Sequence, residues 1–390
     1  MAIINRIGDF HDDMTAWRRD LHAHPELGFE EVRTSAFVAE KLRSFGLDEV
    51  HTGLARTGVV GVLRAGSGRD AIGLRADMDA LPIEEATGRP YASTVPGKMH
   101  ACGHDGHTTM LLGAARYLAE TRNFDGTVYF IFQPAEEMQG GGRVMVEEGL
   151  FERFAAARVF GMHNWPRMPL GTFAMRAGPI MAAADRVEIR LIGQGGHGAM
   201  PHLCRDPVVA GAQIVTALQT VVARNVDPVA QGVVSITQFH GGDADNVIPQ
   251  EVTLRGTIRS FAPEVRDLLE RRVGEIARVV AQAHEVRADV TYTRGYPATI
   301  NSEAETAQAA AAAADVVGED RVDRAAPPVM GAEDFAYMLE QRPGAYVFMG
   351  VGGDESAPTL HSPDYDFNDE ALPYGASYWA RLVEQLLPAR

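Results

Sequence analysis

The stretch RVEIRLIGQGGHGAMPH, from Arg186 to His202, marks the point at which the pattern of the chain changes, and it decides the fold. Apolar and charged residues alternate from 187 to 192, which is typical of a strand with one buried face. A glycine-rich loop that carries His197 follows this strand. From there to residue 294 the chain reads helix, two strands, helix, strand, which indicates a split βαβ sandwich of about 110 residues.

The rest of the chain follows a different pattern. Short apolar strands alternate with helices, which is typical of an α/β fold on a mainly parallel sheet. We expect two domains, an α/β domain formed by 1–184 and 297–390 and an inserted, ferredoxin-like α+β sandwich formed by 185–296. The expected helices lie at 34–45, 108–118, 207–224, 263–284, 303–316 and 370–387, and the expected strands at 59–63, 72–76, 128–132, 158–162, 187–192, 233–239, 252–260, 290–294 and 345–350.

The composition narrows the class of protein. An apolar fraction of 46% and a charged fraction of 23% are typical of a folded chain. The 36 basic and 52 acidic residues give a formal charge of −16, which disfavours nucleic acid and anionic membranes as partners. The chain has two cysteines, no signal-like start and no apolar run of about 18 residues, the length of a membrane span. These features predict a cytoplasmic protein that binds neither nucleic acid nor membranes.

Residue types that bind metals gather where the expected strands end. Cys102 and His104 stand two residues apart, so a thiolate and an imidazole can reach the same ion. In open α/β sheets, ligands bind outside the carboxyl ends of the strands, where side chains from several strands converge. The mixture of Cys, His and Glu suits divalent transition metals. The other positions of this kind are Glu136-Glu137, His163, His361, and Asp77 with Asp79.

Each of these residues by itself also has a purely structural interpretation. A single cysteine is more often a small buried apolar residue than a ligand. A single histidine is more often hydrogen-bonded in the core or at the surface. A Glu-Glu pair is usually a solvated helix start, and we assign Glu30-Glu31, Glu84-Glu85 and Glu147-Glu148 to that class. Glu136-Glu137 differs from these pairs because it follows an apolar strand and Pro134.

Eight segments together resemble a known family. The resemblance is to the hippurate hydrolase and N-acyl-amino-acid amidohydrolase family, which is the amidohydrolase branch of the dimetal aminoacylases and carboxypeptidases. It extends over nearly the whole chain, and the segments occur in the family's order. They are HPELGFEE (24–31), LRADMDALPI (74–83), MHACGHDGHTTMLLGAA (99–115), FQPAEEMQGGGRVMVEEGL (132–150), GMHNWP (161–166), GGHGAMPH (195–202), MGAEDFAYM (330–338) and LHSPDYDFNDEAL (360–372).

The resemblance implies a metal centre in the α/β domain, which would then be the catalytic domain. It implies two divalent ions per subunit, with Mn, Zn, Ni and Co all suited to the ligands. Cys102 would bridge the two ions, and Glu136 would be the general base. Asp79 would orient a ligand imidazole, although its usual histidine partner is replaced by Asp77, which leaves that role open. The remaining ligands implied are His104 and His163 on one ion, and Glu137 and His361 on the other.

The resemblance also implies a contribution from the inserted domain. His197 would stabilise the oxyanion of the tetrahedral intermediate, and in many dimetal relatives this residue comes from the partner subunit. A homodimer or homotetramer is therefore expected. Asn246 and Arg259 would hold the substrate, with Arg259 as a clamp for a carboxylate. The alternative for Arg259 is a strand residue that faces solvent.

The activity implied is metal-dependent hydrolysis of N-acyl amino acids to a carboxylic acid and a free amino acid. One alternative is a dipeptidase or carboxypeptidase that applies the same dimetal chemistry to small peptides. Another is a metal- or ligand-binding relative without activity. The residues leave the acyl group and the amino acid open.

Overall fold

The structure is a computed structural model that describes residues 3–137 and 139–389. It divides into two compact units. The first unit contains the chain up to Ile180, Ile300–Pro327 and the chain from Asp334, and the second contains Met181–Thr299 and Pro328–Glu333. The junctions at 181 and 299 lie close to those expected at 185 and 296. The short return at 328–333 was not expected from the sequence.

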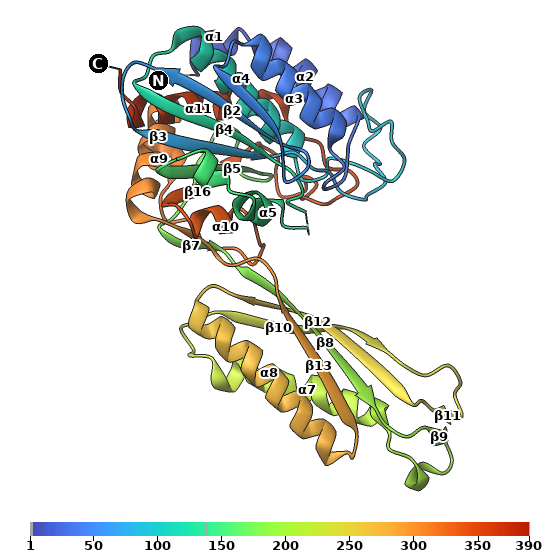
Figure 1. Ribbon diagram of the computed structural model, residues 1–390. Coiled ribbons are helices and arrows are strands. Elements are labelled where there is room, and N and C mark those ends of the chain that lie inside the picture. The colour runs from blue at the N-terminus through green and yellow to red at the C-terminus, as the bar shows by residue number, and fades with distance from the viewer. Residues whose placement is uncertain (1–2, 138, 390) are drawn as a thin grey trace. The chain divides into compact units, whose positions relative to one another are not determined.

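The first unit is built on an eight-stranded mixed sheet (Figure 1). Its central strands are parallel, as predicted, whereas β1 and β2 extend one edge as antiparallel strands. The strand order is β1-β2-β4-β3-β5-β16-β6-β15. The bounds are Glu49–Leu54 (β1), Gly58–Ala65 (β2), Ala71–Asp77 (β3), Gly126–Gln133 (β4), Arg158–Trp165 (β5), Phe173–Ala174 (β6), Val322–Asp323 (β15) and Gly344–Gly350 (β16).

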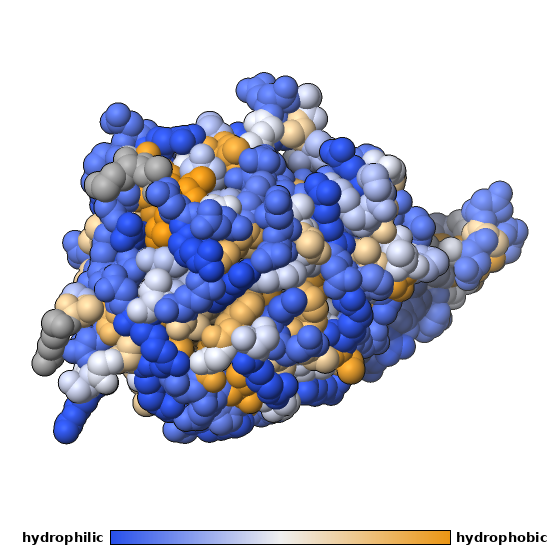
Figure 2. All heavy atoms as spheres, turned by 90° about the horizontal axis from the view of Figure 1, so that it is seen from above, coloured by the Kyte–Doolittle hydropathy of each residue, from blue (hydrophilic) through white to orange (hydrophobic). Residues whose placement is uncertain are grey.

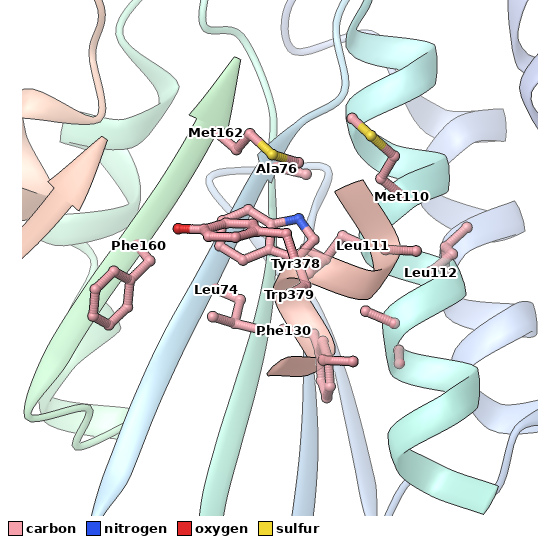
Figure 3. Packing of buried hydrophobic residues seen from close by; sticks show 14 of the residues in the cluster. Leu74, Ala76, Met110, Leu111, Leu112, Phe130, Phe160, Met162, Tyr378 and Trp379 are labelled. Atoms are coloured by element: carbon pink, nitrogen blue, oxygen red, sulfur yellow. The ribbon is translucent and has the colours of Figure 1, made fainter. Parts of the chain in front are cut away.

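Helices pack on this sheet through alternate strand residues, because successive side chains of a strand point to opposite faces. Leu74 of β3 and Phe130 of β4 belong to one large apolar core with residues of α4 and α11. Figure 3 shows Tyr378 and Trp379 of α11 between these strands and α4. The helices of this unit include α1 (Asn5–Gly8), α2 (His11–Ala23), α3 (Val32–Ser44), α4 (His104–Thr121), α5 (Gly141–Glu147), α6 (Leu150–Arg153), α9 (Glu303–Val317), α10 (Ala336–Leu339) and α11 (Leu372–Leu386).

The parallel strands carry the residues that follow them to one edge of the sheet. β3, β4 and β5 end at Asp77, Gln133 and Trp165, so their carboxyl ends lie at the same edge. Helix α4 begins there, directly after Gly103. A Cβ on Gly103 would lie 2.4 Å from the side-chain oxygen of Asn164, and its φ is +89°. Glycine is therefore required for α4 to begin beside the end of β5.

The second unit has the predicted order of strand, helix, two strands, helix and strand. Its sheet is antiparallel, in the order β10-β12-β8-β13. Figure 1 shows α7 and α8 on the same face, where they cover the apolar side of the sheet. The bounds are Ala183–Ile192 (β8), Pro207–Asn225 (α7), Gly232–His240 (β10), Glu251–Ser260 (β12), Pro263–Ala283 (α8) and Arg287–Arg294 (β13).

Helix α7 differs from the expectation that no segment of the chain has the length and composition of a membrane span. It is long and apolar enough to cross a membrane, by length and composition alone. Its side chains at Ile214, Leu218 and Val221 are fully buried in the core of the second unit, against the sheet. The helix begins at Pro207 after Asp206, whose carboxylate accepts the backbone N–H of Val208 at 2.8 Å. One face of α7 therefore belongs to the core of this unit.

The exposed surface is mainly polar. Figure 2 shows hydrophilic residues over most of the face seen there, with apolar residues in small patches between them. Most large apolar side chains lie in the two cores. The surface is therefore left mainly to polar and charged residues, of which the acidic ones are in excess.

Candidate metal centre

Five predicted ligands lie together at the carboxyl edge of the first unit's sheet. The ligand atoms of Cys102, His104 and His163 lie within 4.8 Å of one another, and so do those of Cys102, Glu137 and His361. Cys102 belongs to both groups, as expected for a residue shared by two ions. Its Sγ lies 3.4 Å from His163 Nε2, and His361 Nε2 lies 3.1 Å from Glu137 Oε1.

These donors fit a pair of divalent ions. Nε2 of His104 is buried and has no hydrogen-bond partner among the described residues, and its nearest carboxylate oxygen, on Asp77, is 3.8 Å away. A buried nitrogen without a partner is costly, and a cation would satisfy it. His361 is about half exposed, whereas Cys102 and His104 are buried, so solvent reaches the group from the His361 side.

The electrostatic surroundings also favour cations. Burial raises the pKa of the Cys102 thiol, and the charges of Glu137 and Glu136 raise it further. Burial opposes the charge on His104, yet Asp77 and Asp79 raise its pKa to about 10. Burial and the neighbouring His107 lower the pKa of His163, which leaves a neutral imidazole ready to bind a metal. Bound cations would replace the proton on His104 and hold Cys102 as a thiolate.

The pair Glu136-Glu137 lies in a tight turn directly after β4. Ala135, the residue before Glu136, is buried and has a φ of +55°, in the left-handed region. The side-chain oxygens of Glu136 and Glu137 lie within 4.8 Å of a ring nitrogen of His104. The turn therefore brings both carboxylates to the ligand cluster, with Glu136 buried and Glu137 beside His361.

Asp79 touches two parts of this cluster. Its Oδ1 lies 3.2 Å from Nδ1 of His104, and its backbone oxygen lies 2.9 Å from the same nitrogen. Its Oδ2 accepts the backbone N–H of Glu137 at 2.8 Å. Asp79 is thus placed to orient a ligand imidazole, as the resemblance implied, although Asp77 replaces the usual histidine. It is also placed to fix the second residue of the glutamate pair.

Asp77 has partners of its own behind the ligands. Its Oδ1 lies 2.6 Å from Nδ1 of His107, and its Oδ2 accepts from Arg75 at 2.7 Å. His107 Nε2 accepts the backbone N–H of Asn164 at 2.9 Å, which fixes the residue next to His163. Residue types alone did not predict this support, because it depends on three segments meeting at the sheet edge.

Two glutamates that were assigned to solvated helix starts have buried side chains instead. Glu31, placed with solvated helix starts, is fully buried, and it accepts the backbone N–H of Ala135 at 2.8 Å and the hydroxyl of Thr57 at 2.6 Å. Glu85 is also largely buried, and its carboxylate lies 3.2 Å from His22. Two nearby groups, a backbone amide and a hydroxyl, compensate the burial of the Glu31 carboxylate. The sequence signal that could have indicated a buried Glu31 is its place in HPELGFEE, one of the segments that resemble the family.

The candidates in the second unit lie at two separate places. His197 lies on β9 (Gly196–His197), which pairs with β11 (Val247–Ile248), and the backbone oxygen of Asn246 accepts the N–H of Gly198 at 2.8 Å. His197 and Asn246 are exposed neighbours. Arg259 is half-buried near the other end of β12, where it donates to the backbone oxygen of Ile258 at 3.1 Å. The structure thus brings His197 and Asn246 together and places Arg259 apart from them.

Comparisons with known proteins give matches over most or nearly all of this chain. The sequence model of peptidase family M20/M25/M40 matches residues 73–385 of this chain. Hippurate hydrolase of Campylobacter jejuni is 42% identical over 99% of this chain and 100% of its own length. IAA-amino acid hydrolase ILR1-like 2 of Arabidopsis thaliana is 41% identical over 96% of this chain and 85% of its own length. A solved dinuclear metal-binding peptidase of Bacillus subtilis, the YXEP protein, is 36% identical over 97% of this chain and 99% of its own, with a TM-score of 0.84.

Proposed function

This chain belongs to peptidase family M20/M25/M40, and we propose that it hydrolyses the amide bond of N-acyl amino acids, with two divalent metal ions per subunit. The resemblance seen in the motifs is thereby confirmed. The observation that carries the proposal is the pair Glu136-Glu137. One buried turn places a general base beside a residue of the ligand cluster that contains Cys102 and His361.

A bound pair of divalent cations supplies an acidified water and a polarised acyl carbonyl. Glu136 takes a proton from the attacking water, holds it, and gives it to the amine nitrogen as the C–N bond breaks. The products are a carboxylic acid and an amino acid, so atoms and protons balance. Glu137 has a different role because its surroundings differ. Burial opposes its ionisation, yet His361 and His104 hold its pKa below the usual value, which keeps it an anionic ligand.

His197 supports the same reaction from the second unit by donating to the developing oxyanion. Strands β8 and β13 both join the first unit's chain at one end, where Asp185 pairs with Arg294. His197 follows the opposite end of β8, which is a ten-residue strand and therefore about 33 Å long. The length of the sheet therefore separates His197 from the points at which β8 and β13 of its own chain join the first unit's chain.

Arg259 lies at the connected end, where it pairs with Ala184, whereas Asn246 precedes the far end of β12, where Glu251 pairs with Ile192. A small substrate cannot touch both ends of one sheet. If both residues bind it, they come from two copies of the chain. This separation supports a homodimer or homotetramer in which a partner contributes His197 and Asn246, and Arg259 holds the substrate carboxylate.

The cellular location of the protein and the identity of its metal ions are also part of the proposal. Reducing conditions would protect a Cys102 thiolate from oxidation, which supports a cytoplasmic location for the protein. Mn, Zn, Ni and Co all match the Cys, His and Glu donors. The preferred ion is the one that gives the highest turnover after reconstitution.

A substrate panel tests the proposed function. Metal-free protein is reconstituted separately with Mn, Zn, Ni and Co and assayed on benzoyl, acetyl, indoleacetyl and longer aliphatic acyl conjugates of several L- and D-amino acids. Simple dipeptides form the second arm. Turnover mainly on acyl conjugates is the expected result. Turnover mainly on dipeptides would establish the dipeptidase alternative, and no turnover in either arm with metal bound would contradict both.

A further inference from the structure

The segment from His24 to Glu31 has no role in the reaction described above, yet it bonds to both loops that carry the site. The backbone oxygen of Glu26 accepts the N–H of Ala80, just after Asp79, at 2.8 Å. At its other end, the Glu31 carboxylate accepts the N–H of Ala135, just before Glu136, at 2.8 Å. One short segment therefore connects the loop after β3 to the turn after β4.

The turn after β4 requires such support. Ala135 has a φ of +55°, in the left-handed region, which is unfavourable for a residue that carries a Cβ. Such a conformation persists only where the surroundings determine it strongly. Ala135 is fully buried, and its backbone oxygen accepts the N–H of Gly141 at 2.9 Å. A Cβ on Gly28 would lie 3.0 Å from the Cβ of Ala135, so the segment packs tightly on the turn.

Two buried carboxylates hold the amides on either side of Glu136. Glu31 accepts the N–H of Ala135, and Asp79 accepts the N–H of Glu137, both at 2.8 Å. Asp79 also contacts His104, so its effects on the ligand and on the turn cannot be separated. The other Glu31 oxygen accepts from Thr57 at 2.6 Å, outside the ligand group. Glu31 is thus connected to the site through the turn.

We propose that Glu31 is a positioning residue for Glu136: it holds Ala135 in its left-handed conformation and thereby aims the general base at the attacking water. The proposal rests on the proposed function of Glu136. Burial raises the pKa of Glu31 to about 7, so the site accepts a neutral group as well as an anion. A glutamine retains a carbonyl oxygen for the Ala135 amide, and its amide can pair with the Thr57 hydroxyl, whereas an alanine retains neither contact.

The test compares Glu31→Ala, Glu31→Gln and a matched control, Glu26→Ala, in the metal-loaded protein. Glu26 is a carboxylate of the same segment that accepts two backbone amides, of Arg33 and Thr34, at the start of α3. Within the described part of the chain, its side chain bonds to α3 and makes no hydrogen bond or ion pair with the turn. Misplacement of a catalytic group by about 1 Å can cost about 100-fold in rate. We expect Glu31→Ala to lower kcat by about 10–100-fold with KM nearly unchanged, Glu31→Gln to restore most of kcat, and Glu26→Ala to lower Tm without this loss.

A second readout does not depend on turnover. In the cobalt-substituted protein, displacement of the turn moves Glu137 and shifts the visible absorption bands in Glu31→Ala, while Glu31→Gln retains the wild-type spectrum. The positioning role is overturned if Glu31→Ala keeps wild-type kcat and spectrum, or if Glu31→Gln and Glu26→Ala lose as much kcat as Glu31→Ala. Failure of the proposed function appears instead as a wild-type protein without turnover, and the cobalt spectra then still decide the role of Glu31.

Discussion

The two units place their candidate residues in opposite environments. In the first unit Cys102, His104 and His163 are buried and already share contacts with one another. In the second unit His197 and Asn246 are exposed on a short strand pair at the end of the sheet. The first arrangement is already formed within a single chain, whereas the second leaves its side chains open to solvent.

The difference follows from the cost of burying polar groups. A buried charge needs partners, so buried ligands of the first unit have further residues behind them, as Asp79 supports His104. An exposed histidine has no such requirement, so the fold of the second unit does not depend on it. Replacement of a buried ligand in the first unit should therefore change metal binding, and replacement of His197 or Arg259 in the second unit should leave the metals in place.

Replacement of the shared ligand should give the largest effect. Cys102→Ala removes a donor from both ligand groups. Loss of a residue that only supports a ligand already costs about 10–100-fold in metal affinity, so loss of the shared donor is expected to exceed about 100-fold. Metal content after dialysis, measured by elemental analysis, checks this. Cys204→Ala, which changes the other cysteine in the second unit, is the control, and equal metal content in both variants would contradict the assignment.

His197→Ala should affect turnover and leave the metals in place. Removal of one oxyanion donor costs about 10²–10³-fold in kcat. Metal content and Tm should match the wild type, because His197 is exposed and its backbone pairing with Val247 remains. Mixing inactive His197→Ala and Glu136→Gln chains under subunit exchange should restore activity if the partner supplies His197. Exchanged mixtures that stay inactive would place His197 in its own chain's site or outside the reaction.

The buried charges of the first unit should also make its stability depend on pH. Burial opposes the charge of His22, yet hydrogen bonds with Asp105 and Glu85 raise its pKa to about 9. Because this pKa exceeds the unfolded value of about 6.5, the stabilisation is complete below pH 6.5 and is lost as pH rises through 9. The shift corresponds to about 3 kcal/mol. Urea unfolding of metal-free protein between pH 6.5 and 10 measures it, and an equal decline in His22→Gln would exclude His22 as the cause.

Arg259 should give the smallest effect. A hydrogen bond to a charged group contributes about 1.5–3 kcal/mol, so loss of a carboxylate clamp should raise KM by about 10–100-fold. Arg259→Ala tests this, with kcat and metal content expected to stay near wild type. Comparison of an acyl amino acid with its amide, which lacks the carboxylate, shows whether the clamp acts there. An equal rise in KM for both substrates would favour a purely structural role for Arg259.

Local patterns predicted most of the fold. Apolar strands such as β3 and β4 are continuous, so residue type and position were sufficient to predict them. The ligand set was implied by the resemblance of the motifs to a known family, because each metal-binding residue type by itself also has a structural interpretation. Helix α2 was not predicted; its N-terminus has no capping side chain. β1 was not predicted because its side chains do not alternate in burial. Glu31 and the contact between Asp77 and His107 depend on segments distant in the chain, which local patterns do not record.

The most direct test of the account is Glu136→Gln in the metal-reconstituted protein, with metal content and turnover of an N-acyl amino acid measured on the same sample. Loss of a general base costs about 10²–10⁴-fold, and the neighbouring ligand Glu137 is unchanged. We expect two metal ions per chain, as in the wild type, and a kcat lower by a factor in that range. Wild-type turnover with the metals retained would contradict it.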